Sequence, residues 1–141
     1  MICPDVNLLL YATFSSYPQH GKAKEWWESV LSGNQTVNLG HVVLLGFLRI
    51  STHPRVFEVP LTLEEAIQAA ESWLAQPNTR LISPGEGHWD SLKAMLRAGH
   101  AGGNLATDAH IAALASEFGL IVYSNDADFA RFPGVKVINP M

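Results

Sequence analysis

The chain has 141 residues, a length typical of one domain, and its 48% apolar residues with four tryptophans argue against a disordered protein. Nine basic and thirteen acidic residues give a net charge of −4, which argues against a protein that holds nucleic acid by bulk electrostatics but allows an enzyme that acts on it. The single cysteine, Cys3, excludes an intramolecular disulfide and a cysteine-rich zinc site. Because no apolar run approaches the ~20 residues of a membrane span and the start lacks the basic region of a signal peptide, we expect a cytoplasmic protein with no membrane partner.

The first half of the chain alternates short apolar runs with helical patterns. Residues 1–4 and 36–39 are typical of strands, although Pro4 within the first of them suits a central strand poorly. Helical spacing of apolar residues predicts helices over 6–15 and 19–32. The next run, HVVLLGFLRIST from His41 to Thr52, is so apolar that we expect a helix with no face on the surface.

The second half carries two signals for helix starts. Thr62 and Glu65 have the spacing of a capping box, which predicts a helix from this point. Ser83 and Pro84 resemble the cap and first residue of a further helix, which would end near Gly99. The remaining expected elements are strands at 80–83, 120–124 and 135–138 and a helix over 107–118.

This alternation predicts an α/β fold with a central parallel sheet and helices on both faces. Right-handed crossovers would place the carboxyl ends of all its strands at one edge. We expect residues 1–141 to form a single domain of this kind.

Four aspartates are predicted to lie near that edge. Asp5 directly follows the first strand, Asp126 and Asp128 follow the strand at 120–124, and Asp108 lies in the first turn of the late helix. Open α/β sheets bind their ligands in the crevice outside the strand carboxyl ends. Converging carboxylates repel one another unless a cation lies between them, and carboxylate oxygens suit Mg²⁺ or Mn²⁺. The sequence therefore favours metal-assisted chemistry on a phosphate.

Each aspartate also has a structural explanation. Asp5 could cap the helix that follows it. Asp108 would be stabilised by the helix dipole without any metal, with Thr107 as the cap. Asp126 and Asp128 could be turn residues, with Asp128 as a second ligand or only a cap for the segment FARF. These roles are compatible with metal binding, and the sequence alone does not separate them.

Other polar residues give weaker indications. Glu86 is explained by its capping position after Ser83, and Glu117 is expected on a solvated helix face. His110 could face the crevice or the solvent. Three arginines could contact phosphates or simply be solvated: Arg49, Arg55 and Arg131.

Several segments together resemble a known family. PDVNLLLYA at the start, and GNLATDAHIAALA and SNDADFARFPGVKVINP near the end, resemble PIN-domain ribonucleases, and within them the VapC toxins of type II toxin–antitoxin pairs. The resemblance implies a PIN-like three-layer sandwich and an endoribonuclease that uses Mg²⁺ or Mn²⁺ to cut structured RNA. It also implies inhibition by a small antitoxin protein and a homodimer. A surplus of apolar helix surface between residues 19 and 60 agrees with such an interface.

The resemblance assigns roles to individual residues. It implies that Asp5, Asp108 and Asp126 are the catalytic acids, and that these three with Asp128 are the metal ligands. Two polar neighbours accompany them: Asn7 and Ser124. The cation would polarise the scissile phosphate and activate water, so no side-chain nucleophile is required.

Gly46 departs from the family pattern, which commonly has a glutamate at this point of the apolar helix. The protein could use its remaining acids with additional water, could carry a substitution that inactivates a toxic enzyme, or could be a catalytically weak relative. Two rival functions follow from the residues. A phosphatase of the haloacid-dehalogenase type would need Asp-x-Asp after the first strand, where this chain has Asp5-Val6-Asn7. A non-catalytic interaction module would explain Gly46.

Overall fold

A parallel five-stranded sheet forms the centre of the molecule in the computed structural model, which describes residues 1–141. The strands are β1 (Ile2–Pro4), β2 (Val37–Gly40), β3 (Thr79–Ile82), β4 (Ile121–Tyr123) and β5 (Val137–Ile138). The helices are α1 (Val6–Thr13), α2 (His20–Leu31), α3 (His41–Ser51), α4 (Leu63–Leu74), α5 (His88–Gly99) and α6 (Ala106–Phe118), with short 3-10 helices η1 (Gly103–Leu105) and η2 (Ala127–Arg131). None of these helices is long and apolar enough to span a membrane.

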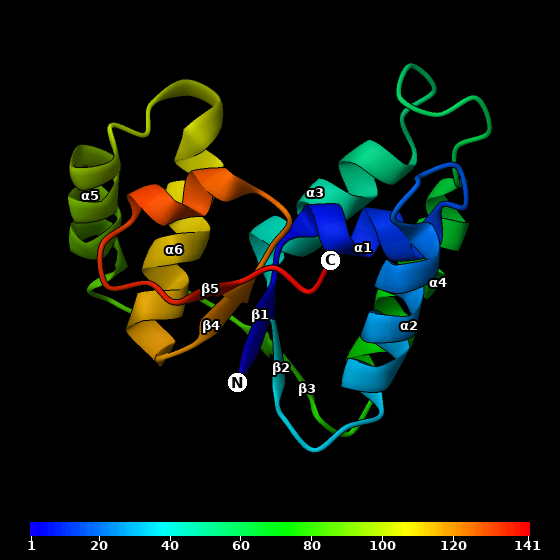
Figure 1. Ribbon diagram of the computed structural model, residues 1–141, viewed down its shortest axis with the longest axis horizontal. Helices are drawn as coiled ribbons and strands as arrows, with labels where there is room; N and C mark the ends of the chain where they lie inside the picture. The colour runs from blue at the N-terminus through cyan, green and yellow to red at the C-terminus, as the bar shows by residue number, and fades with distance from the viewer.

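The sheet lies between two helical layers, as Figure 1 shows, with α5 and α6 on one side and α1 to α4 on the other. Helix α6 lies close to the strands because it carries the unbroken buried run 111–115, in which three residues are alanine. At Gly40 a Cβ atom would lie 2.9 Å from the Leu114 side chain, so a larger residue would push this helix away. The predicted α/β sandwich with an all-parallel sheet is confirmed.

The strand order places a topological switch point beside β1. The order is β3-β2-β1-β4-β5, so the chain moves to one side of β1 for β2 and β3 and to the other side for β4 and β5. Ligand crevices of open parallel sheets lie outside the strand carboxyl ends at such a reversal. The loops after β1 and β4 are therefore the natural place for a site in this fold.

Pro4 is accommodated in the central strand by the way β1 pairs. The pairing with β2 consists of Ile2 opposite Val37, whereas the pairing with β4 continues to Pro4 opposite Tyr123. The Ile2 amide donates to Thr36 on the β2 side, and the Asp5 amide donates to Tyr123 on the β4 side. Amide direction alternates along a strand, so the missing amide hydrogen of Pro4 faces β2, beyond the last paired residue.

Helix α3 contradicts the prediction of a helix with no exposed face. Val43 and Phe47 are buried, but the Leu45 residue is 64% exposed and His41 and Arg49 are also exposed. The apolar run therefore covers the core with one face and leaves leucine on the other. Composition alone cannot distinguish a fully buried helix from one whose outer apolar face is exposed to solvent.

Helix α5 begins later than predicted. It starts at His88 after Gly87, and Ser83 does not cap it. Glycines at 85 and 87 disfavour the first turn, and the Gly85 amide instead donates to the Glu117 carboxylate of α6. Thr107 is likewise not a cap, because α6 already begins at Ala106.

The capping box at the start of α4 is confirmed. The Glu65 amide donates to Thr62 Oγ1 at 3.1 Å, and the Thr62 amide donates to Glu65 Oε1 at 2.9 Å. We expect Thr62→Ala to lower the free energy of unfolding in urea by about 1 kcal/mol, because a helix amide loses its acceptor. Ser72→Ala on the exposed face of the same helix is the control, with an expected change within about 0.5 kcal/mol. Equal losses in the two variants would contradict this prediction.

Candidate active site

Three of the four predicted acids converge at the switch point. Asp108 lies in the first turn of α6, Asp126 caps η2 just after β4, and Asp128 lies within η2. Carboxylate oxygens of these three residues lie within 4.8 Å of one another. The 3-10 helix after β4 thus brings two acids to the amino end of α6, whose dipole favours negative charge there.

Asp5 lies beside this group rather than within it. Its carboxylate accepts a hydrogen bond from the Val6 amide at 2.7 Å, so it has the predicted capping contact with α1. Its other oxygen accepts from the Ser124 hydroxyl at 2.8 Å. The residue is only 5% exposed, yet its charge raises the pKa of Asp108. Asp5 is therefore both a cap and a charge that faces the same crevice.

Ser124 joins the ends of β1 and β4. Besides donating to Asp5, its oxygen accepts from the Asp126 amide at 2.9 Å and from Asn7 Nδ2 at 3.3 Å. Asn7 Oδ1 is buried and has no hydrogen-bond partner in the protein. This hydroxyl fixes the distance between Asp5 and Asp126, and the orphaned amide oxygen adds another oxygen donor beside the acids.

The electrostatics of the site show an excess of negative charge. Burial, with a further contribution from the charges of Asp5, Asp126 and Asp128, raises the pKa of Asp108 to about 7, while Arg131 acts to lower it. Burial also raises the pKa of Asp5, against the hydrogen bonds from Ser124 and Val6. An all-oxygen donor set with an unbalanced charge suits a hard divalent cation such as Mg²⁺ or Mn²⁺.

Arg131 is the cation that lies beside these acids. Its Nη2 is 3.5 Å from Asp128 Oδ1, and its Nη1 donates to the Gly99 carbonyl at the end of α5 at 2.8 Å. The arginine therefore ties η2 to α5 while offsetting part of the acidic charge. The other two arginines proposed from the sequence, Arg49 and Arg55, are exposed and form no ion pair.

The raised pKa of Asp108 predicts a pH-dependent stability in EDTA. Asp108 is protonated below a pKa of about 7 in the folded protein, against 3.8 in the unfolded chain. Between these two pKa values the folded state binds more protons than the unfolded chain. The free energy of unfolding therefore falls as the pH rises, and the loss is complete once the pH exceeds the pKa of the folded protein. We expect Asp108→Asn to gain stability relative to the wild type as the pH rises through this window, measured by urea unfolding.

The control for this experiment is Asp90→Asn, which removes an acid whose side chain is 84% exposed. Its stability difference from the wild type is expected to stay nearly constant with pH. A constant difference for Asp108→Asn as well would contradict the assignment of the raised pKa.

His110 is partly buried and lies against a second histidine, His88. Its Nδ1 lies 2.9 Å from His88 Nε2, and His88 Nδ1 lies 3.2 Å from Glu117 Oε2. Glu117 is exposed, as predicted, but its carboxylate also accepts a hydrogen bond from the Gly85 amide. Glu86 is exposed and makes no side-chain contact of this kind. No local pattern indicates this cluster, because its members are far apart in the chain.

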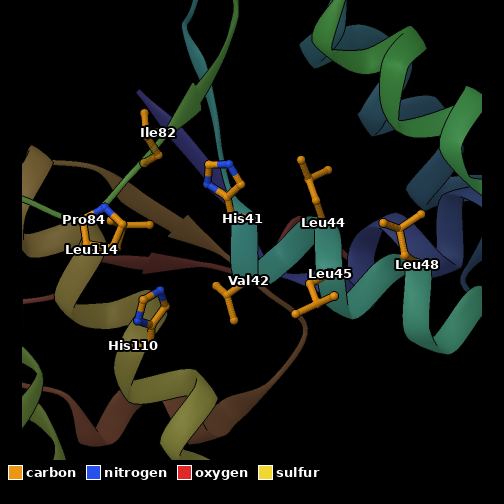
Figure 2. A pocket seen from close by; sticks show the side chains of 9 residues that line it. All are labelled: His41, Val42, Leu44, Leu45, Leu48, Ile82, Pro84, His110 and Leu114. Atoms are coloured by element: carbon orange, nitrogen blue, oxygen red, sulfur yellow. The ribbon is translucent and has the colours of Figure 1, made fainter.

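An apolar pocket of about 650 Å³ lies away from the acids. Figure 2 shows Val42 and Leu45 of α3 on one side and His110 and Leu114 of α6 on the other. No candidate metal ligand lines it. This pocket continues the exposed leucine face of α3.

Gly46 lies on α3 against the first turn of α1. A Cβ atom at this position would lie 3.3 Å from Val6 Cγ2, and Val6 directly follows Asp5. The position is thus adjacent to the acidic site, and α3 contributes no carboxylate there. No residue of α3 is an acid, so the glutamate that the family resemblance implies at this point has no substitute on this helix.

Comparison with known proteins gives consistent results. A family model described as the PIN domain matches residues 2–135. Ribonuclease VapC33 of Mycobacterium tuberculosis is 40% identical over 141 residues, which cover 100% of this chain and 99% of the relative.

Two solved structures share the fold. A toxin–antitoxin complex from Klebsiella pneumoniae has a TM-score of 0.64 at 18% identity, covering 100% of this chain and 98% of the other. VapC20 of M. tuberculosis, described as a sarcin–ricin loop cleaving toxin, has a TM-score of 0.69 at 20% identity, covering 96% of this chain and 99% of the other.

Proposed function

This chain belongs to the PIN-domain family and is a VapC-type member of it, and we propose on that premise that it is a metal-dependent endoribonuclease that hydrolyses phosphodiester bonds in structured RNA. The observation that carries the proposal is the convergence of Asp108, Asp126 and Asp128 at the switch point beside Asp5. Ribonuclease VapC33, which matches the whole chain, supports the RNA substrate. The description of VapC20 as a loop-cleaving toxin supports structured RNA.

The acids would hold Mg²⁺ or Mn²⁺. Asp108, Asp126 and Asp128 offer the closest oxygens, and Asp5 would act from the adjoining position. When bound, the cation supplies Lewis-acid polarisation of the scissile phosphate and activation of water. The Ser124 hydroxyl holds the Asp5 carboxylate in place and favours its ionised form against the effect of burial, and the Asp128 amide holds Asp126 through a 2.9 Å hydrogen bond. Such chemistry needs no side-chain nucleophile.

The test is incubation of the purified protein with total RNA in Mg²⁺ or Mn²⁺, with EDTA as the control, followed by mapping of new RNA ends. The proposal expects discrete cuts in the metal-containing samples and none in EDTA. Cuts that persist in EDTA, or turnover of a phosphomonoester instead of RNA, would contradict it. The latter result would favour the phosphatase alternative.

A second candidate, a catalytically impaired interaction module, is favoured by Gly46. This alternative expects no cuts with the natural sequence at any Mn²⁺ concentration. Because a side chain at this position would start next to Val6, which directly follows Asp5, Gly46→Glu adds a carboxylate on α3 beside the first turn of α1. Cuts by Gly46→Glu but not by the natural protein would identify an inactivated nuclease, and no cuts by either would favour the binding module.

A small antitoxin protein is the proposed regulatory partner. The shared fold with a toxin–antitoxin complex supports this part of the proposal. Copurification with the product of a neighbouring gene, and loss of RNA cleavage on its addition, are the expected results. Undiminished cleavage in the presence of a bound partner would contradict the inhibitory role.

The exposed face of α3 is the proposed homodimer interface. Leu45 is 64% exposed, and Leu44 and Leu48 beside it line the apolar pocket. We expect Leu45→Glu to weaken self-association by at least about tenfold in sedimentation, because a charge would be buried without a partner. Leu63→Glu is the matched control, since Leu63 is also 64% exposed but lies at the start of α4. A monomeric wild type, or an equal effect of the two variants, would contradict this interface.

A further inference from the structure

A second, smaller pocket adjoins the acidic site on the β5 side. It encloses about 290 Å³, near the lower end of the roughly 300–1,000 Å³ of small-ligand sites. Ser124 and Asp126 form the wall that it shares with the acids, and Asn125 and Asn139 form its polar rim. A group in this pocket would therefore lie directly next to a phosphate held at the acids.

The two asparagine side chains form one hydrogen-bonded unit. Asn139 Nδ2 donates to Asn125 Oδ1 at 3.0 Å, and Asn139 Oδ1 accepts from the Met141 amide at 3.0 Å. Asn125 Nδ2 lies 3.5 Å from the Tyr11 hydroxyl. Each amide nitrogen carries two hydrogens and each amide oxygen accepts two bonds, so both side chains keep a donor and an acceptor for a ligand.

The rest of the lining suits a flat apolar face. The apolar part of the wall consists of Ala127, Ala130 and Val137, and the small side chains of the two alanines leave space for a ligand. No lysine or arginine lines the pocket, and Asp126 would repel a phosphate there. A nucleobase has apolar faces and an edge with neighbouring donor and acceptor groups, whereas ribose and phosphate do not combine these features.

We infer that this pocket binds the unpaired nucleobase next to the scissile phosphate, with Asn125 and Asn139 hydrogen-bonding its Watson–Crick edge. The inference rests on the proposed function and adds a requirement to it. A base can enter only when it is unstacked and unpaired, so the RNA must be cut at a loop, bulge or single-stranded segment. Asn139 and Asn125 are then specificity residues rather than metal ligands.

The test uses uncharged nucleosides in EDTA, so that it depends on neither the metal nor cleavage. Uridine is titrated into the ¹⁵N-labelled protein while the side-chain amide signals of the asparagines are followed by NMR. We expect saturable shifts for Asn125 and Asn139, weaker binding of 3-methyluridine, which lacks the N3 donor, and none of ribose. Asn139→Ala should weaken uridine binding by about fivefold, as expected for one lost hydrogen bond.

Asn34→Ala is the matched control, since Asn34 is an exposed asparagine that lines a different pocket. It should bind uridine like the wild type. No saturable shift up to the solubility limit, equal binding of ribose, or unchanged binding by Asn139→Ala would overturn the inference. If the protein binds nucleosides but cuts no RNA, the pocket is still a base-binding site and only the proposed nuclease activity is contradicted. Failure of the pocket and failure of the nuclease activity are therefore distinguishable.

Discussion

Replacing Asp126 by asparagine is expected to lower RNA cleavage by at least about a thousandfold and to leave the fold intact. A divalent cation at the site contributes several kcal/mol to the transition state, and each 1.36 kcal/mol corresponds to about tenfold in rate. The fold should survive because the asparagine oxygen can still accept the Asp128 amide hydrogen bond that Asp126 accepts now. Single-turnover cleavage of an RNA mapped with the natural protein measures this loss.

Asp108→Asn should show the same loss of cleavage together with a gain in stability in EDTA at neutral pH. It removes the carboxylate that burial and three neighbouring acids hold at a raised pKa of about 7. Replacing a residue that stabilises the fold would instead lower the stability. Asp90→Asn, which removes an exposed acid paired with Lys93, is the control and should retain full activity. Full activity in Asp108→Asn or Asp126→Asn would remove that residue from the site.

The largest loss of stability is expected for Phe47→Ala. Phe47 is fully buried, and its ring packs edge-on against Trp73 with centroids 4.7 Å apart, so it joins α3 to α4. Phenylalanine-to-alanine changes in cores cost about 3–5 kcal/mol, a large share of the roughly 5–15 kcal/mol of a typical domain. Urea unfolding followed by far-UV circular dichroism measures the shift.

Phe118→Ala provides the comparison, because Phe118 at the end of α6 is 41% exposed. Its replacement should cost less than about 1 kcal/mol, as for other surface positions. A loss below about 1.5 kcal/mol for Phe47→Ala would mean that the space collapses around the smaller side chain. Equal losses for the two variants would contradict the packing described for α3 and α4.

The fold was largely predictable because its strands are short, apolar and separated by helical patterns. Parallel strands with helical crossovers leave few arrangements, and the same rule indicated that Asp5 and Asp126 lie at one edge. The sequence could not show that Asp128, rather than Asp5, lies in the tight group with Asp108. That difference depends on the turn of η2, which tertiary contacts such as the Arg131 bond to Gly99 determine.

Errors in the sequence prediction occurred where local signals competed with distant partners. Ser83 and Pro84 have the pattern of a helix start, but Glu117, distant in the chain, binds the Gly85 amide and the helix begins later. Asn139 directly follows β5, so the rule that places Asp5 at the edge of the sheet applies to Asn139 equally. Polar residues after every strand of a parallel sheet, not only acids, therefore belong among the candidates.

The most direct test of the acidic site is Mn²⁺ binding followed by the electron paramagnetic resonance signal of the free ion. The natural protein at pH 8 should deplete this signal saturably without RNA, because Asp108 is then ionised beside Asp126 and Asp128. Asp108→Asn and Asp126→Asn should lose most of this binding, and Asp90→Asn should keep it. Absence of binding by the natural protein, or undiminished binding by both site variants, would contradict a metal centre at these aspartates.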